Sequence, residues 1–141
     1  MFHTIIIAGN VGRDPEMRYT PSGQAVTNFS IATSRQYTSS DGQPVKETIW
    51  FRIATWGKLA ETCNQYLKKG RQVLVEGRLV PDPNTGGPRT FNRQDGTVGA
   101  AFEVTASTVR FLGSRTEEEG SYPTGAYSES APVESDDNIP F

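Results

Sequence analysis

The chain has 141 residues, of which 35% are hydrophobic, and a formal net charge of −2. This length fits one domain with a hydrophobic core and excludes two domains of ordinary size. The charge is unevenly divided. Residues 1–112 carry thirteen Lys and Arg against nine Asp and Glu, a net charge of +4, whereas residues 113–141 carry one Arg against seven acidic residues, a net charge of −6. This division predicts a basic module that meets a polyanion, followed by an acidic segment with a separate role.

The composition also argues against catalytic and metal-binding functions. His3 is the only histidine and Cys63 the only cysteine, so neither a nucleophile–histidine relay nor a His–Cys metal cluster can be assembled. The apolar run at residues 5–8 is too short for a signal peptide or a membrane span. We therefore expect a cytoplasmic protein, without a membrane association, that is not an enzyme and binds no cofactor.

Strand patterns begin the chain. Residues 2–8 are rich in β-branched side chains and end at a Gly-Asn-Val-Gly bend, residues 25–33 alternate between two faces, and residues 46–56 form a third, long strand. Residues 37–44 between the last two are polar and contain an Asp-Gly turn signal. The first half of the chain is therefore predicted to be β-structure.

A helical pattern follows at residues 57–70, where Leu59, Cys63, Tyr66 and Leu67 form one apolar stripe. Lys68 and Lys69 are predicted to lie in its last turn, with Gly70 as the residue that ends it. Two further strands are predicted at residues 72–80 and 101–111, separated by a Pro- and Gly-rich mobile excursion over residues 81–99.

About five strands with one helix between the third and fourth are the layout of the OB-fold, a five-stranded Greek-key barrel. We therefore predict an all-β domain with one short helix over residues 1–112. Residues 113–141 consist largely of Ser, Gly, Pro and Glu. Such a segment cannot bury enough apolar surface to offset its ordering entropy, which predicts a disordered acidic tail.

Residues 48–56 are the most informative stretch. Alternation along a strand places Ile49, Phe51 and Ile53 on the core face. The opposite face then carries Trp50, Arg52 and Trp56, two indoles with a guanidinium between them. Such a face suits base stacking and phosphate or cation–π contact on single-stranded nucleic acid. The alternative is that the two indoles form a contact between subunits.

Basic and aromatic residues extend the predicted binding surface. Phe91, between Arg89 and Arg93, and Tyr37 are further candidate rings, although Tyr37 serves equally well as an anchor for the turn. Ordinary surface solvation, or for Lys68 and Lys69 the helix dipole, is the alternative for each basic residue. The basic candidates are Lys58, Lys68, Lys69, Arg71 and Arg78.

Several stretches of the chain together resemble the bacterial single-stranded DNA-binding proteins. These stretches lie at residues 6–16, 18–23, 50–52, 56–61, 66–70 and 75–77, and again at the terminal Asp-Asp-Asn-Ile-Pro-Phe of residues 136–141. The resemblance implies an OB-fold that assembles as a homotetramer and binds single-stranded DNA without base specificity. The expected function is the protection of such DNA during replication, recombination and repair.

The resemblance also assigns roles to residues. Stacking positions fall on Tyr37, Trp50 and Trp56, basic contacts on Lys58, Lys68 and Lys69, and subunit packing on Phe51. A stacking residue that the family often has near position 84 is replaced here by Asn84, and we expect Phe91 to substitute for it. The tip that recruits replication, recombination and repair proteins corresponds to Asp136, Asp137, Ile139, Pro140 and Phe141.

Two other functions remain open from the sequence. An OB-fold protein that prefers RNA fits the same pattern, because backbone charge and stacking do not report the 2′-hydroxyl. A scaffold that binds only proteins, with the tryptophan face as an oligomer contact, is the second alternative. Quenching of tryptophan fluorescence by oligo-dT separates this scaffold from a nucleic-acid-binding protein.

Overall fold

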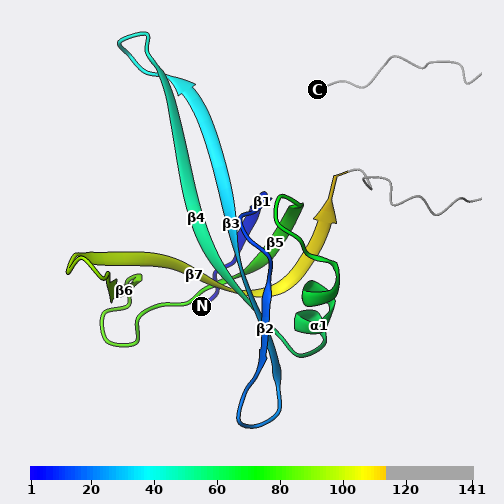
Figure 1. Cartoon of the computed structure of the whole chain (residues 1–141). Coiled ribbons are helices and arrows are strands. Elements are labelled where there is room, and N and C mark those ends of the chain that lie inside the picture. The colour runs from blue at the N-terminus through cyan, green and yellow to red at the C-terminus, as the bar shows by residue number, and fades with distance from the viewer. Residues whose placement is uncertain (114–141) are drawn as a thin grey trace, which may run out of the picture.

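The computed structural model describes residues 1–113, so the predicted acidic tail and its tip lie outside the described residues. Within that range the chain forms strands joined by short turns and one helix (Figure 1). The elements are β1 (Ile5–Val11), β2 (Glu16–Tyr19), β3 (Ala25–Thr38), β4 (Pro44–Trp56), α1 (Gly57–Tyr66), β5 (Gln72–Leu79), β6 (Arg89–Asn92) and β7 (Val98–Leu112).

Five of these strands close into a barrel in the order β1-β5-β7-β4-β3, and the end of β1 pairs back onto β3 at Asn10↔Ala32 and Val11↔Ile31. The β4–β7 pairing is parallel, and the other pairings are antiparallel. The helix α1 connects the third barrel strand, β4, to the fourth, β5. This closed five-stranded barrel with one short helix confirms the OB-fold prediction.

Two short strands outside the barrel were not predicted. β2 pairs with the start of β3, and β6 pairs with the start of β7. The second pairing changes the interpretation of residues 81–99, because part of this excursion is a hairpin. Its turn is closed by hydrogen bonds from Arg93 N to Thr97 O (2.8 Å) and from Gly96 N to Arg93 O (3.0 Å). Gly96 adopts φ 84°, a conformation that favours glycine.

The β3–β4 hairpin is longer than predicted and projects from the barrel (Figure 1). Its pairing continues to Thr38↔Pro44, so the polar loop predicted at residues 37–44 is confined to residues 39–43. Because the hairpin projects, only part of the predicted core face of β4 is buried. Ile53 is buried and Phe51 is half-buried, but Ile49 is 43% exposed. Alternation assigned these residues to one face correctly, but only the barrel end of that face is covered.

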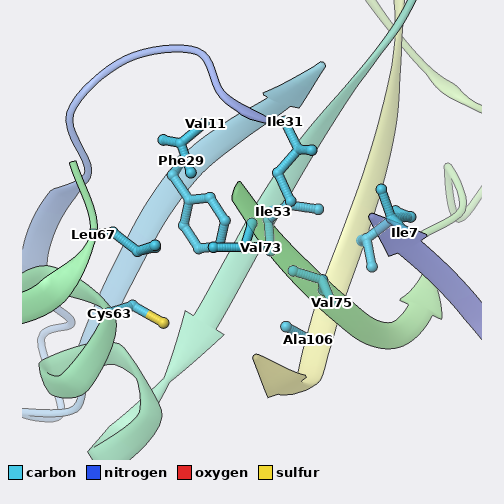
Figure 2. Close-up of a cluster of buried hydrophobic side chains, with 11 residues drawn as sticks. Ile7, Val11, Phe29, Ile31, Ile53, Cys63, Leu67, Val73, Val75 and Ala106 are labelled. Carbon is cyan, nitrogen blue, oxygen red and sulfur yellow. The ribbon is translucent and has the colours of Figure 1, made fainter. Parts of the chain in front are cut away.

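The barrel interior holds one cluster of buried apolar side chains (Figure 2). α1 closes one end of it with Ala60 and Cys63, both fully buried. One buried hydroxyl joins the helix to the sheet, since Thr27 Oγ1 of β3 donates to Ala60 O (2.7 Å). A second links β4 to β3, since Thr55 Oγ1 donates to Thr27 O (2.9 Å). The cluster consists of Ile7, Val11, Phe29, Ile31, Ile53, Cys63, Leu67, Val73, Val75, Val104 and Ala106.

The predicted end of the helix is wrong by one turn. α1 ends at Tyr66, and Leu67 is already in an extended conformation (φ −77°, ψ 139°) with its side chain buried in the barrel. Lys68 and Lys69 therefore follow the helix instead of ending it. Gly70 has φ 87° and donates from N to Val11 O (2.7 Å), which joins this segment to the end of β1. No helix of the described residues is long and apolar enough to cross a membrane.

Candidate nucleic-acid interface

The outward face of β4 carries the three residues that alternation predicted for it. Trp50 is 54% exposed and Trp56 is 42% exposed, and Arg52 between them is exposed as well. At the usual rise along a strand, the two indoles are separated by about 20 Å. This spacing allows the two rings to contact different bases of one strand.

Two hollows meet on this face over β3 and β4, the second and third strands of the barrel. They share Arg13, Ser30 and Arg52 as lining residues, and one reaches Trp50 while the other reaches Trp56. The shared lining makes them one groove that runs along β4, and we call it the tryptophan groove. In an OB-fold this is the face that binds oligonucleotides.

Four arginines line the Trp56 end of the groove: Arg13, Arg18, Arg52 and Arg89. Guanidinium groups suit phosphate because they present a planar set of donors that binds two oxygens at once. Arg13 and Arg18 were not among the predicted contacts. Their position depends on how the loop after β1 and the short strand β2 fold against β3. The only available signal was their place within the stretches that carry the family resemblance.

The groove also contains acidic side chains. Asp14, Glu16 and Glu103 line the same hollow as the four arginines. Glu103 Oε2 lies 3.5 Å from Arg89 Nε, and the two side chains form the one ion pair among residues 1–113. The pair is partly solvated, since the side chains are 51% and 24% exposed. The groove is therefore a mixed surface in which arginines outnumber carboxylates.

Phe91 lies on β6 with its ring against charged groups. The guanidinium carbon of Arg52 is 4.8 Å from the ring centroid, and that of Arg93 is 5.7 Å from it. The ring is 36% exposed. The ring therefore contacts two cationic side chains. Base stacking on Phe91 stays a prediction.

The other predicted basic contacts do not line this groove. Lys58, Lys68, Lys69, Arg71 and Arg78 are all exposed, and they are not among the residues that line either hollow. Arg71 has internal contacts: Nη1 donates to Tyr66 O (3.2 Å), and its guanidinium lies 4.8 Å from the centre of the Phe111 ring. The segment of Lys69 lies beside the loop after β1, because Lys69 N donates to Asp14 Oδ1 (2.9 Å). Their contacts with DNA remain predictions.

Tyr37 lies on the projecting hairpin, apart from the two tryptophans. It pairs with Val45 across the hairpin, and strict alternation places Val45 on the opposite face of β4 from Trp50. The Tyr37 hydroxyl donates to Glu47 Oε1 (3.1 Å), and the Arg35 guanidinium lies 5.0 Å from its ring centre. The hydrogen bond to Glu47 and the charge of this carboxylate raise the pKa of Tyr37. The structure thus shows an anchored ring, and stacking by Tyr37 remains a prediction.

The predicted interaction tip, Asp136 to Phe141, lies outside the described residues. Among residues 1–113, no group of three His, Cys, Asp or Glu side chains is arranged to hold a metal ion. A small closed barrel with an arginine-lined groove and two exposed indoles over its second and third strands is an oligonucleotide-binding barrel in its architecture.

Comparison with known proteins gives the family. The profile described as the Single-strand binding protein family matches residues 2–112, and the chain belongs to this family. Members of this family are binding proteins and not enzymes, in agreement with the prediction from composition.

Curated relatives carry the same description. A single-stranded DNA-binding protein of Neisseria meningitidis is 42% identical over 119 residues, which are 84% of this chain and 64% of that protein. Single-stranded DNA-binding protein 1 of Chlorobaculum tepidum is 40% identical over 131 residues, 91% of this chain and 75% of that protein. The chain thus spans less than two thirds of the Neisseria relative.

Solved structures show the same fold. The chain in a structure described as a Plasmodium falciparum SSB complex with ssDNA superposes with a TM-score of 0.65 at 24% identity, covering 80% of this chain and 97% of that one. A deletion mutant of the single-stranded DNA binding protein from Thermus aquaticus superposes with a TM-score of 0.60 at 27% identity, covering 79% of this chain and 51% of that one.

Proposed function

We propose that this chain binds single-stranded DNA without base specificity, along the tryptophan groove. The observation that carries the proposal is the exposure of Trp50 and Trp56 on either side of Arg52. Indole rings stack on any base, because every base has a π-face, and each stacked base contributes about 1–3 kcal/mol. The arginines between and beside them supply the charge that a phosphate backbone requires.

The groove favours a single strand over a duplex. Bases that are paired and stacked in a duplex have no free face for an indole, whereas unpaired bases can be turned toward the protein. The names of the Neisseria and Chlorobaculum relatives, and the ssDNA complex of the Plasmodium chain, support the same ligand. Binding of this kind protects single strands from reannealing and nucleases during replication, recombination and repair.

Titration of the full chain with fluorescein-labelled oligo-dT, followed by anisotropy and by tryptophan fluorescence, tests this proposal. We expect tight binding with quenching of the indoles, and a logarithm of affinity that falls with the logarithm of salt concentration by about 0.7 per phosphate neutralised. Equal affinity for oligo-rU would favour the RNA alternative. An absence of binding to both would favour a protein scaffold and overturn the proposal.

The proposed active form is a homo-oligomer, and the family resemblance suggests a tetramer. The described residues leave one edge of β1 open, since β1 pairs with β3 only at Asn10 and Val11. Ile6 on this strand is 64% exposed, and an exposed apolar edge is a template for pairing with another copy. Phe51 and Phe102, whose ring centres lie 5.9 Å apart, extend the core face beyond the covered barrel. A monomer in sedimentation equilibrium would contradict this assembly.

The terminal residues Asp136, Asp137, Ile139, Pro140 and Phe141 form the proposed docking tip for replication, recombination and repair proteins. Acidity alone serves solubility, but an Ile-Pro-Phe terminus after two aspartates also offers an apolar ring and a carboxylate to a basic-rimmed pocket. Deleting Phe141 should abolish recruitment and leave DNA binding nearly unchanged. Recruitment that persists without Phe141 would reduce the tip to a charged end.

A further inference from the structure

Two hairpins of this chain close with the same turn around an Asp-Gly pair. One turn is residues 39–43 at the far end of the projecting β3–β4 hairpin (Figure 1), and the other is residues 93–97 of the β6–β7 hairpin. In each, the first residue donates from N to O of the fifth, and the glycine donates from N to O of the first. Gly42 has φ 78° and Gly96 has φ 84°. Both Asp-Gly pairs are exposed. The two backbones therefore match, and the turns differ in their side chains.

The carboxylate of Asp95 is held by its own turn. Its Oδ1 accepts hydrogen bonds from Thr97 N (2.9 Å) and from Thr97 Oγ1 (2.6 Å). These bonds, the one from the Thr97 side chain most of all, lower the pKa of the Asp95 carboxyl. Asp41 has Gln43 in place of this threonine. Within residues 1–113 no hydrogen bond or ion pair holds the Asp41 carboxylate, which is therefore free to rotate toward the main chain.

An aspartate that precedes glycine is open to attack by its own main chain. The nitrogen of Gly42 bonds to Cγ of Asp41 and loses its proton, and the hydroxyl of the acid leaves as water, which closes a succinimide ring. Water then adds to the ring and breaks one of its two C–N bonds. Cleavage at Cγ restores aspartate, whereas cleavage at the main-chain carbonyl carbon gives isoaspartate. Glycine favours the attack because no Cβ shields its nitrogen. One water is lost and one is gained, so the reaction needs no oxidant and no cofactor.

We propose that Asp41 is a site of spontaneous isomerisation to isoaspartate in the folded chain, and that the two hydrogen bonds from Thr97 protect Asp95 from the same reaction. Ring closure requires a carboxyl group that rotates toward the next nitrogen and releases its hydroxyl. Asp95 is held in place and stays ionised to a lower pH, so it meets both conditions less well. The hydrogen bond of the glycine nitrogen slows the reaction in both turns alike. The proposal does not depend on the proposed function.

Isomerisation at Asp41 would alter the end of the β3–β4 hairpin. Isoaspartate adds one methylene to the main chain between Asp41 and Gly42, so the hydrogen bond from Gly42 N to Ser39 O (2.9 Å) cannot keep its geometry. The strand pairing begins directly beside this turn, and Tyr37 and Val45 are partners there. A stored sample should therefore become a mixture of chains that differ at this end of the hairpin.

Storage of the full chain at neutral pH, well below its melting temperature, tests the proposal. Isoaspartate is located by peptide mapping, and enzymatic methylation from S-adenosylmethionine marks its carboxylate. In the native chain, isoaspartate should form about three- to tenfold faster at Asp41 than at Asp95, the change in rate that one hydrogen bond corresponds to. In denaturant both turns are lost, and the two rates should become nearly equal.

Two variants exchange the protecting side chain between the turns. Gln43→Thr places a hydroxyl where Thr97 has one, and should slow the reaction at Asp41. Thr97→Val removes that hydroxyl, and should speed the reaction at Asp95. Asp41→Glu keeps the charge but disfavours the ring, so the signal from this turn should vanish. Gln24→Thr is the matched control, because it makes the same substitution in the equivalent turn of the β2–β3 hairpin, which contains no aspartate.

Each outcome decides the proposal. Faster formation at Asp41 in the native chain alone, reversed by the exchange of side chains, supports it. Equal native rates, or a faster rate at Asp95, overturn it. Absence of isoaspartate at both residues of the native chain, with formation at both in denaturant, also overturns it, since the shared turn then protects both. A difference that persists in denaturant assigns the effect to local sequence and removes the role of Thr97. Thermal unfolding checks that each variant folds, and either exchange variant is sufficient if the other does not.

Discussion

Trp50 lies directly across Gly12, the residue that follows β1. A Cβ built on Gly12 would overlap Cζ3 of the indole and lie 2.9 Å from Cη2. The same Cβ would also lie 3.1 Å from Ser30 Oγ on β3. The orientation of this exposed ring therefore depends on the absence of a side chain at residue 12.

Gly12→Ala should displace the Trp50 ring and weaken binding of oligo-dT. The loss should reach part of a stacking contribution of about 1–3 kcal/mol, because the ring must tilt away from the groove. Gly87→Ala is the matched control, since a Cβ there meets nothing closer than 3.6 Å. Equal binding by both variants would show that the Trp50 orientation is unimportant for affinity.

Trp50→Ala and Trp56→Ala should each weaken DNA binding by about 1–3 kcal/mol, the contribution of one stacked base. The two rings are separated by about 20 Å along β4. Their losses should therefore add in the double variant. Both indoles are more than two-fifths exposed, so the melting temperature should change little. Normal binding by both single variants, or unfolding of both, would contradict the stacking role.

Local pattern was sufficient to predict the residues of the β4 face. Alternation over residues 48–56 separated Trp50 and Trp56 from Ile53 before any partner strand was known. The barrel followed from the order of strand and helix patterns. Ile49 shows the limit of such reasoning, since alternation gives the face of a residue but not where neighbouring elements stop covering it.

The remaining features depend on contacts distant in sequence. Arg13, Arg18 and Arg52 line one hollow because β1, β2 and β4 are brought together by pairing with β3. The predicted end of α1 was wrong because Leu67, which fits the apolar stripe of the helix, is instead extended and buried in the barrel. The contact of Phe91 with Arg52 requires a hairpin within a segment that composition marked as mobile.

Cys63 should be unreactive in the folded protein. Burial raises the pKa of its thiol from 9.0 to about 11, while a hydrogen bond involving Thr55 acts in the opposite direction. At pH 8 about one thiol in a thousand is then ionised, and the thiolate is the reactive form. The raised pKa stabilises the fold below about pH 9, and this contribution is lost as pH rises through about 11.

Labelling with a maleimide at pH 8 checks this expectation. The native chain should react slowly, and the chain in denaturant should react at the rate of an ordinary thiol. Saturating oligo-dT should not change the native rate, because Cys63 lies in the core cluster and does not line the groove. Rapid labelling of the native chain would show that α1 separates from the barrel far more readily than its contacts indicate.

The last prediction concerns Glu103, whose carboxylate forms an ion pair with Arg89 within the groove. The distance from Oε2 of Glu103 to Nε of Arg89 is 3.5 Å. A phosphate that binds Arg89 must compete with this carboxylate and is repelled by it. Glu103→Gln keeps the size of the side chain and removes its charge. We expect it to raise the affinity for oligo-dT about two- to fivefold, the scale of one partly exposed ion pair. The salt slope should steepen by up to about 0.7, as for one further phosphate neutralised.

Glu76→Gln is the matched control, because it makes the same change of charge at an exposed residue of β5 that does not line the groove. Arg89→Gln should weaken binding, and adding Glu103→Gln to it should recover only the part of the affinity that was lost to repulsion. Anisotropy over a salt series measures all four variants. If Glu76→Gln and Glu103→Gln raise the affinity equally, the change in net charge alone explains the effect. The prediction that Glu103 competes with phosphate for Arg89 would then be wrong.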